Sequence, residues 1–356
     1  MVKQLPVSLI GRAHWPARDQ AAWERACQPV GFLAEETSLQ SFPLERRHVI
    51  EQAYSRWLGF LATTMPPDQI RSGIDWLDQT HLQSFVDLLS AHVAPYTVRH
   101  YLTNLLTAIN HMAPSQDHRA LIQAVRHAAR TAKRQGNKTI RMVPARDLYA
   151  WGFELMRTAK TRSTPLKRTA QFRDGLMIAM LIARPLRLAN FAAIELDRHL
   201  TCQDGVYWLS FTAKEVKTRR PLQFALPSEL GSAVDDYLHH HRGLLLERRG
   251  GWWRAHNGKA LWISDHGTPC AAKQISARIR KRTAAKFGRS INPHLFRDCA
   301  ATSIAIEDPE HVGIIAPVLG HSNALTAERY YNQARTMQAV NRYQDTLARL
   351  LQELAP

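Results

Sequence analysis

The chain has 356 residues, of which 45% are hydrophobic, so it is long and apolar enough to fold into two domains. Its 47 Lys and Arg residues against 30 acidic residues give a net charge of +17, a balance shared by nucleic-acid-binding, ribosomal and membrane-surface proteins that makes phosphate contacts expected. The isolated cysteines Cys27, Cys202, Cys270 and Cys299 indicate neither a disulfide framework nor a zinc site, and the longest apolar run, Gly175 to Ala183, is shorter than the ~20 residues of a membrane helix, so we expect a soluble, cytosolic protein with no membrane partner.

The first third of the chain predicts a helical domain. Residues 1 to about 40 mix Pro, Trp and charged residues without periodicity, and we expect an irregular arm there. From Leu44 an apolar stripe with helical spacing runs to the Pro66-Pro67 pair, which ends it. Two further stripes, Leu82 to Leu89 and Val98 to Met112, predict two more helices, and a fourth helix starts near His118.

A basic run follows from Arg119 to Arg141, with seven Lys or Arg and no acidic residue. Such a run is either a solvated helix face or a surface that contacts DNA, and the overall charge favours DNA. Gly136-Asn137 is a natural hinge, so we place a linker at 136–142. The residues expected to bind DNA are Arg126, Arg130, Lys133, Arg134, Lys138 and Arg141.

Beyond Val143 the pattern changes to helices with a small hairpin. We expect a helix from Ala145 to Thr158 and two short strands, Val206 to Phe211 and Leu222 to Leu226, rich in β-branched and aromatic residues. A basic segment lies between the strands. The triplet His239-His240-His241 is not expected to bind metal, because adjacent side chains on a helix point in different directions.

A second basic cluster and a chemically distinctive stretch close the chain. The cluster is expected to bind backbone phosphates and contains Arg278, Arg280, Lys281 and Arg282. After it, His294 and Arg297 stand three positions apart in a run without Gly or Pro, so both side chains should leave the same side of one helix. Gly320 permits a tight turn before His321, and Tyr330 stands nine positions after that histidine. Tyr330 is the candidate nucleophile.

These ordered elements, His-x-x-Arg, Leu-Gly-His and the spaced tyrosine, resemble the carboxy-terminal signature of the tyrosine recombinases, the phage-integrase-like enzymes. The resemblance implies an earlier catalytic arginine at a helix start. Ala-Arg-Pro-Leu-Arg-Leu-Ala-Asn places it at Arg187, with Arg184 as a competitor, although Pro185 and Asn190 stand where the family usually has Gly and Glu.

The resemblance also implies a catalytic lysine on a β-hairpin. Within Lys-Glu-Val-Lys-Thr-Arg, the register favours Lys214, with Lys217 as the runner-up because the usual glycines are absent. Lys217 and Arg219 are then expected to contact DNA.

The fold implied by the resemblance is mainly α with a small antiparallel β-sheet, arranged as a two-domain clamp on double-stranded DNA. The helical core-binding domain would span residues 41–135 and the integrase-like α+β catalytic domain residues 143–335. The apolar stripe of the final helix, 336–356, packs on its own domain or docks on a neighbouring subunit, as in a tetramer on two duplexes. Accessory DNA-bending proteins are further expected partners.

The chemistry needs cations on the phosphate oxygens, a nucleophile and an acid, because alkoxide is a poor leaving group. The implied catalytic set is Arg187, Lys214, His294, Arg297, His321 and Tyr330. The arginines would hold the phosphate, the histidines would add hydrogen bonds, and Lys214 would protonate the 5′ oxygen. The resulting 3′-phosphotyrosine conserves bond energy, so rejoining needs neither ATP nor metal, and no cofactor is expected.

Two other functions fit parts of the pattern. A type IB topoisomerase uses similar groups and relaxes DNA as a monomer, but the spacing from Leu-Gly-His to the tyrosine and the final helix favour a recombinase. A non-catalytic architectural DNA-binding protein would have lost a catalytic position, whereas all six are present. Tyr331 is a second candidate nucleophile, which the spacing disfavours.

Overall fold

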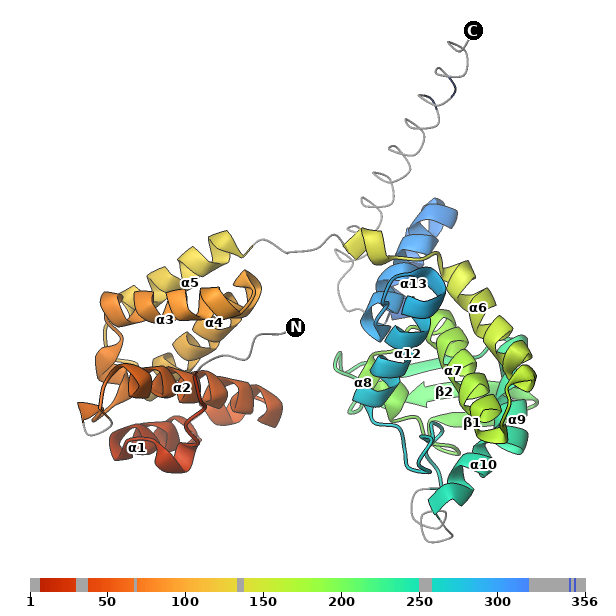
Figure 1. Ribbon diagram of the computed structural model, residues 1–356, viewed down its shortest axis with the longest axis horizontal. Helices are drawn as coiled ribbons and strands as arrows, with labels where there is room; N and C mark the ends of the chain where they lie inside the picture. The colour runs from red at the N-terminus through yellow and green to blue at the C-terminus, as the bar shows by residue number, and fades with distance from the viewer. Residues whose placement is uncertain are drawn as a thin grey trace. The chain divides into compact units, whose positions relative to one another are not determined.

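The computed structural model describes residues 7–29, 38–66, 69–132, 138–249 and 258–319, together with positions 346 and 349. The chain divides into two compact units, Met1–Asn137 and Lys138–Pro356. In these described ranges helices dominate both units, and a small antiparallel sheet lies in the second (Figure 1). The predicted mainly α composition with a small antiparallel sheet is therefore confirmed.

The first unit is a helical bundle. Its helices are α1 (Ala17–Ala26), α2 (Leu44–Thr64), α3 (Gln79–His92), α4 (Pro95–Met112) and α5 (Arg119–Thr131). Helix α4 packs against α1, α2 and α5, and the fully buried side chains of Trp57, Phe85 and Leu102 belong to the common core. The apolar stripes that predicted α2, α3 and α4 thus face this core, and these three predictions are confirmed.

The expectation of an irregular arm at residues 1 to 40 is wrong for its central part. Helix α1 is part of the bundle, and Trp15 and Trp23 are only 3% and 2% exposed. The indole Nε1 of Trp15 donates a hydrogen bond to Ser55 Oγ on α2, at 3.2 Å. The apolar pattern did not predict this helix, because its buried face includes the polar residue Asp19. The Asp19 carboxylate accepts hydrogen bonds from Ser72 Oγ and from the backbone N–H of Gly73.

The second unit surrounds one long buried helix. Its helices are α6 (Ala145–Arg157), α7 (Pro165–Ala183), α8 (Leu188–Ala192), α9 (Ser228–Asp236), α10 (Arg242–Leu246), α12 (Ala272–Phe287), α13 (Pro293–Glu307) and α14 (Ile315–Leu319). Helix α7 is buried along nearly its whole length and contacts α6, α9, α10, α12 and α13. Gly152 and Gly175 let α6 and α7 approach closely, since a Cβ on Gly175 would lie 2.6 Å from the Gly152 carbonyl oxygen.

The sheet has the order β1-β2-β3, with β1 at Leu200–Gln203, β2 at Val206–Phe211 and β3 at Leu222–Ala225. The two predicted strands, β2 and β3, are confirmed, and β1 is an addition that the sequence analysis missed. Asp204 and Gly205, both with positive φ, form the tight turn between β1 and β2. On β2, Tyr207, Leu209 and Phe211 alternate toward the core of the unit.

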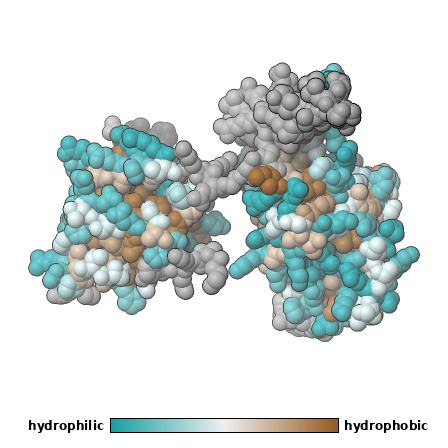
Figure 2. Space-filling view, turned by 45° about the horizontal axis from the view of Figure 1, so that its top comes forward, coloured by the Kyte–Doolittle hydropathy of each residue, from teal (hydrophilic) through white to brown (hydrophobic). Residues whose placement is uncertain are grey.

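On the face shown in Figure 2, hydrophilic residues are common in both units, and a strip of hydrophobic residues is visible on the first unit. Over the described ranges, no helix combines the length and apolarity needed to cross a membrane.

Candidate active site

Five of the basic residues named in the sequence analysis line one pocket of about 590 Å³ in the second unit. They come from four elements: the segment before α8, the β2–β3 loop, α12 and α13. The lining residues are Arg187, Leu188, Lys217, Ser276, Arg280, Asn292, Pro293, His294 and Arg297. No acidic side chain contributes to this lining, so the pocket suits a negatively charged group.

The start of α13 carries two of these residues. Asn292 caps the helix by accepting a hydrogen bond from the Leu295 backbone N–H at 2.9 Å, and Pro293 occupies the first turn. One turn of helix then separates exposed His294 from Arg297, which is only 5% exposed. Both side chains reach the pocket, as their spacing of three predicts.

Arg297 also ties distant segments together. Its Nη1 donates to the Pro185 carbonyl and its Nη2 donates to the Leu319 carbonyl at 2.5 Å. Pro185 precedes Arg187 by two positions, and Leu319 is followed by Gly320 and His321. The guanidinium is therefore held in place by the backbone that leads into Arg187 and by the last residue of α14.

The structure separates Arg187 from its competitor Arg184. Arg187 precedes α8 directly and lines the pocket. Arg184 instead donates to the Ala225 carbonyl at 3.0 Å and stacks over the Phe224 ring, 5.4 Å from its centroid. Burial lowers the pKa of Arg184 below its ordinary value. The Arg184 side chain is thus held by β3, and of these two arginines only Arg187 lines the pocket.

Of the two lysines in the β2–β3 loop, the one that lines the pocket is not the one favoured by the sequence. Lys217 lines the pocket, whereas Lys214, the residue favoured by the register, is not among the lining residues. The reason is local: Val216 is 3% exposed and anchored in the core, and Lys217 follows it directly. The runner-up is therefore the lysine that the structure brings to Arg187 and His294.

The second basic cluster divides into two groups. Arg280 lines the pocket, and its Nε donates to Ser290 Oγ at 3.1 Å. Arg278 and Arg282 instead bind the buried carboxylate of Asp174, at 3.3 and 3.0 Å. Both side chains remain partly exposed, at 28% and 27%, and their contact with DNA stays a prediction.

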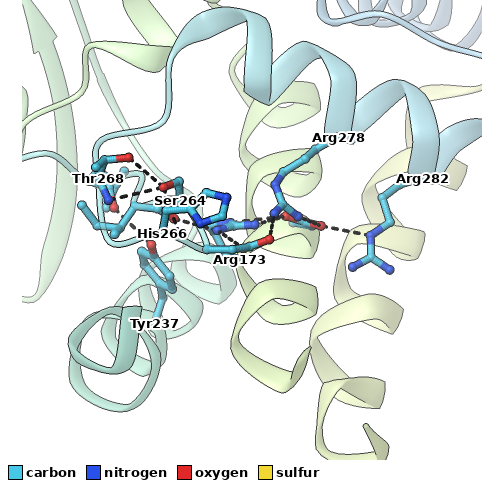
Figure 3. Close-up of polar contacts among 11 residues, drawn as sticks. Arg173, Tyr237, Ser264, His266, Thr268, Arg278 and Arg282 are labelled. Carbon is cyan, nitrogen blue, oxygen red and sulfur yellow. Dashed lines mark hydrogen bonds and ion pairs between the residues drawn. The ribbon is translucent and has the colours of Figure 1, made fainter. Parts of the chain in front are cut away.

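Figure 3 shows the network that engages these two arginines. At its centre Arg173, which has no exposed side-chain surface, pairs with Asp174 at 2.9 Å and with Asp265 at 3.0 Å. Arg278 also pairs with Asp265. The network joins α7, the loop after Ile263 and α12, so it fixes the helix that carries Arg280 and Ser276.

The remaining expected DNA contacts are only partly described. Arg126, Arg130, Arg141, Arg219 and Lys281 are all exposed. Lys138 begins a short 3₁₀ turn, Lys138–Arg141. Outside the described residues lie Lys133, Arg134, His321, Tyr330 and Tyr331, together with nearly all of the expected final helix at 336–356.

Two features of the site were not predicted from the sequence: Ser276 as a lining residue, and the network of Arg173 and Asp174. Ser276 stands four positions before Arg280, so a helical reading of the basic cluster could have placed it on the same face. Nothing in the local sequence signals that Asp174 binds arginines 104 and 108 positions away.

The residues that line this pocket fall within a stretch of the chain that matches a known protein family. The model of the phage integrase family matches residues 153–337. The solved structure of XerA recombinase is 13% identical in sequence, with 85% of this chain and 93% of that chain covered and a TM-score of 0.39. A search of the curated proteins gave no match.

Proposed function

Because the chain belongs to the phage integrase family of tyrosine recombinases, we propose that it is a site-specific DNA recombinase that works through a covalent 3′-phosphotyrosine intermediate. The observation that carries the proposal is the pocket where Arg187, Lys217, His294 and Arg297 meet. A scissile phosphodiester is the ligand that suits such a set of cationic and hydrogen-bonding groups.

The two arginines would bind the non-bridging oxygens of the scissile phosphate. Arg297 is the more rigid of the two, because the Pro185 and Leu319 carbonyls hold its guanidinium. Fixed donors of this kind stabilise the negative charge that grows in the pentacoordinate transition state, without reorganisation during the reaction. His321 would add a further hydrogen bond.

Bond exchange then proceeds in balanced steps. The hydroxyl oxygen of Tyr330 attacks phosphorus, and its proton passes to His294. The bond from phosphorus to the 5′ oxygen breaks, and Lys217 gives that oxygen a proton. The 3′-phosphotyrosine ester retains the bond energy, so attack by a 5′ hydroxyl of a second strand reverses these steps and rejoins DNA. No step requires ATP or a metal ion.

We assign the general acid to Lys217 in preference to Lys214. The support is positional, because Lys217 shares the pocket with the residues that would bind the phosphate. A general acid must lie within hydrogen-bond reach of the leaving oxygen. Lys214 remains the comparison residue for mutagenesis.

The first unit is proposed as the core-binding domain of a two-domain clamp. Its support is the basic face of α5, where Arg126 and Arg130 are exposed and no acidic residue occurs in the helix. Phosphate contacts from both units would position the duplex. A tetramer on two recombination sites in the cytosol, with accessory DNA-bending proteins and with the final helix docked on a neighbour, completes the proposal.

The test is covalent trapping on nicked duplexes that carry candidate sites, with Tyr330→Phe and Tyr331→Phe as a matched pair. An adduct that survives denaturation and disappears only in Tyr330→Phe supports the proposal. Strand exchange between two duplexes then distinguishes recombination from relaxation by a topoisomerase. Salt-sensitive binding with no adduct on any substrate would instead indicate an architectural DNA-binding protein.

A further inference from the structure

The loop between β2 and β3 folds around a single carboxylate, that of Glu215. Its Oε2 accepts hydrogen bonds from the backbone N–H of Thr212 at 2.9 Å and from Thr212 Oγ1 at 2.7 Å. On the other side, its Oε1 binds His199 Nε2 at 3.0 Å and the guanidinium of Arg198. The hydrogen bond from His199, with those from Thr212, lowers the pKa of Glu215 to about 2, so the carboxylate is ionised.

The His199 ring is oriented so that it donates a hydrogen bond to the Glu215 carboxylate. The backbone N–H of Glu195 donates to its Nδ1 at 3.0 Å, so Nδ1 is an acceptor and the ring proton lies on Nε2, facing Glu215. The ring is 4% exposed and stacks on Phe211, with 4.9 Å between the ring centroids. His199 immediately precedes β1 and packs on the last residue of β2, so it is a fixed hydrogen-bond donor to the start of the loop.

A second hydrogen bond joins the β2–β3 loop to helix α8, which begins directly after Arg187. Asn190 Nδ2, on α8, donates to the backbone carbonyl of Glu215 at 2.8 Å. Arg187 is the N-cap residue of that same helix. One residue beyond Glu215, Val216 is anchored in the core, and Lys217 follows at the pocket. The hydrogen bond thus connects the two elements that carry Arg187 and Lys217.

We propose that Glu215, His199 and Asn190 are positioning residues that hold Lys217 beside Arg187 for protonation of the departing 5′ oxygen. The assignment rests on the proposed function. None of the three residues lines the pocket, so they act through the loop and not on the substrate. Without these ties the lysine would sample many loop conformations, and proton transfer would lose its fixed geometry.

The proposal predicts a selective defect, because a general acid matters only when the leaving group is poor. An alkoxide leaving group needs the proton, whereas sulfur at the bridging 5′ position leaves readily, since a thiol has a reference pKa of ~8.5. Loss of the hydrogen bonds that hold the loop should therefore slow cleavage of the oxygen substrate and leave the cleavage rate of the sulfur substrate nearly unchanged. A general loss of folding or of DNA binding would slow both.

The experiment measures single-turnover adduct formation by the full-length chain on nicked duplexes with either a 5′-oxygen or a 5′-bridging sulfur at the scissile phosphate. The variants are Glu215→Ala, Asn190→Ala and Lys217→Ala. Asn190→Ala leaves the carboxylate network intact, so it keeps the test valid if Glu215→Ala fails to fold. Arg198→Ala is the matched control, because this partner of Glu215 is 59% exposed and its ion pair should contribute little.

The expected result is a loss of roughly 10- to 100-fold on the oxygen substrate for Glu215→Ala and Asn190→Ala, within the range of general acid catalysis, and less than about 2-fold on the sulfur substrate. Lys217→Ala should show the same selectivity with a larger loss. Equal losses on both substrates, or none, would overturn the positioning role while leaving the proposed function standing. Absence of any adduct with the unaltered chain on both substrates would overturn the proposed function itself.

Discussion

Replacing Asp174 with Asn should destabilise the second unit strongly. The carboxylate of Asp174 is 2% exposed and pairs with Arg173 at 2.9 Å, Arg278 at 3.3 Å and Arg282 at 3.0 Å. Asn keeps the shape but removes the charge, and Arg173 would then keep its ion pair with Asp265 and its hydrogen bond to the Ile263 carbonyl. Removing one partner of a buried ion pair costs about 3–5 kcal/mol, so the Tm of this unit should fall by roughly 6 to 20 °C.

Urea unfolding followed by circular dichroism provides the assay, with Asp75→Asn as the control. Asp75 pairs with Arg18 on the surface, where the side chains are 40% and 58% exposed, so its replacement should cost less than about 1 kcal/mol. The two units can unfold separately, so each transition is fitted by itself. A loss below about 1 kcal/mol for Asp174→Asn would refute the view that this network holds α12 in place.

Two further predictions concern packing and thiol chemistry. Gly175→Ala should lower the free energy of unfolding of the second unit by about 1–3 kcal/mol, since the new Cβ would lie 2.6 Å from the Gly152 carbonyl oxygen. The control is Gly243→Ala, where nothing lies within 4 Å of the new Cβ, so the same urea titration should show no such loss. Burial raises the pKa of Cys299 to about 11, so with a thiol reagent at pH 8 Cys299 should stay unmodified while exposed Cys202 reacts, and modification of folded Cys299 at that pH would contradict its burial.

Local patterns predicted the elements whose buried faces are apolar. Helix α2 begins at Leu44, where its stripe begins, and β2 spans the predicted residues Val206–Phe211. In both, the residues that face the core are hydrophobic, so periodicity alone reveals them. The start of α13 was equally readable, because Asn292 and Pro293 combine an N-cap with a first-turn proline.

The elements that were missed have polar groups where a pattern search expects apolar ones. Helix α1 buries Asp19, which its hydrogen bonds to Ser72 and Gly73 make tolerable. Strand β1 has little apolar alternation, although the Asp204-Gly205 turn that follows it was a usable hairpin signal.

The candidate site was predictable in its residue types and less so in its assignments. Arg187, His294 and Arg297 could be named from spacing and resemblance, and they line one pocket. The spacing favoured Lys214 over Lys217, whereas the lysine that lines the pocket is Lys217, which follows the buried Val216. The role of Arg282 depended on a carboxylate 108 positions away, which no local reading of the sequence contains.

The proposed reaction depends on a covalent bond between DNA and Tyr330. The most direct measurement is proteolysis of the trapped adduct, followed by mass spectrometry of the peptide that carries the 3′-phosphonucleotide. We expect a modified peptide with the nucleotide on Tyr330 in the unaltered chain and none in Tyr330→Phe. A nucleotide attached to Tyr331 or to any other side chain would contradict it.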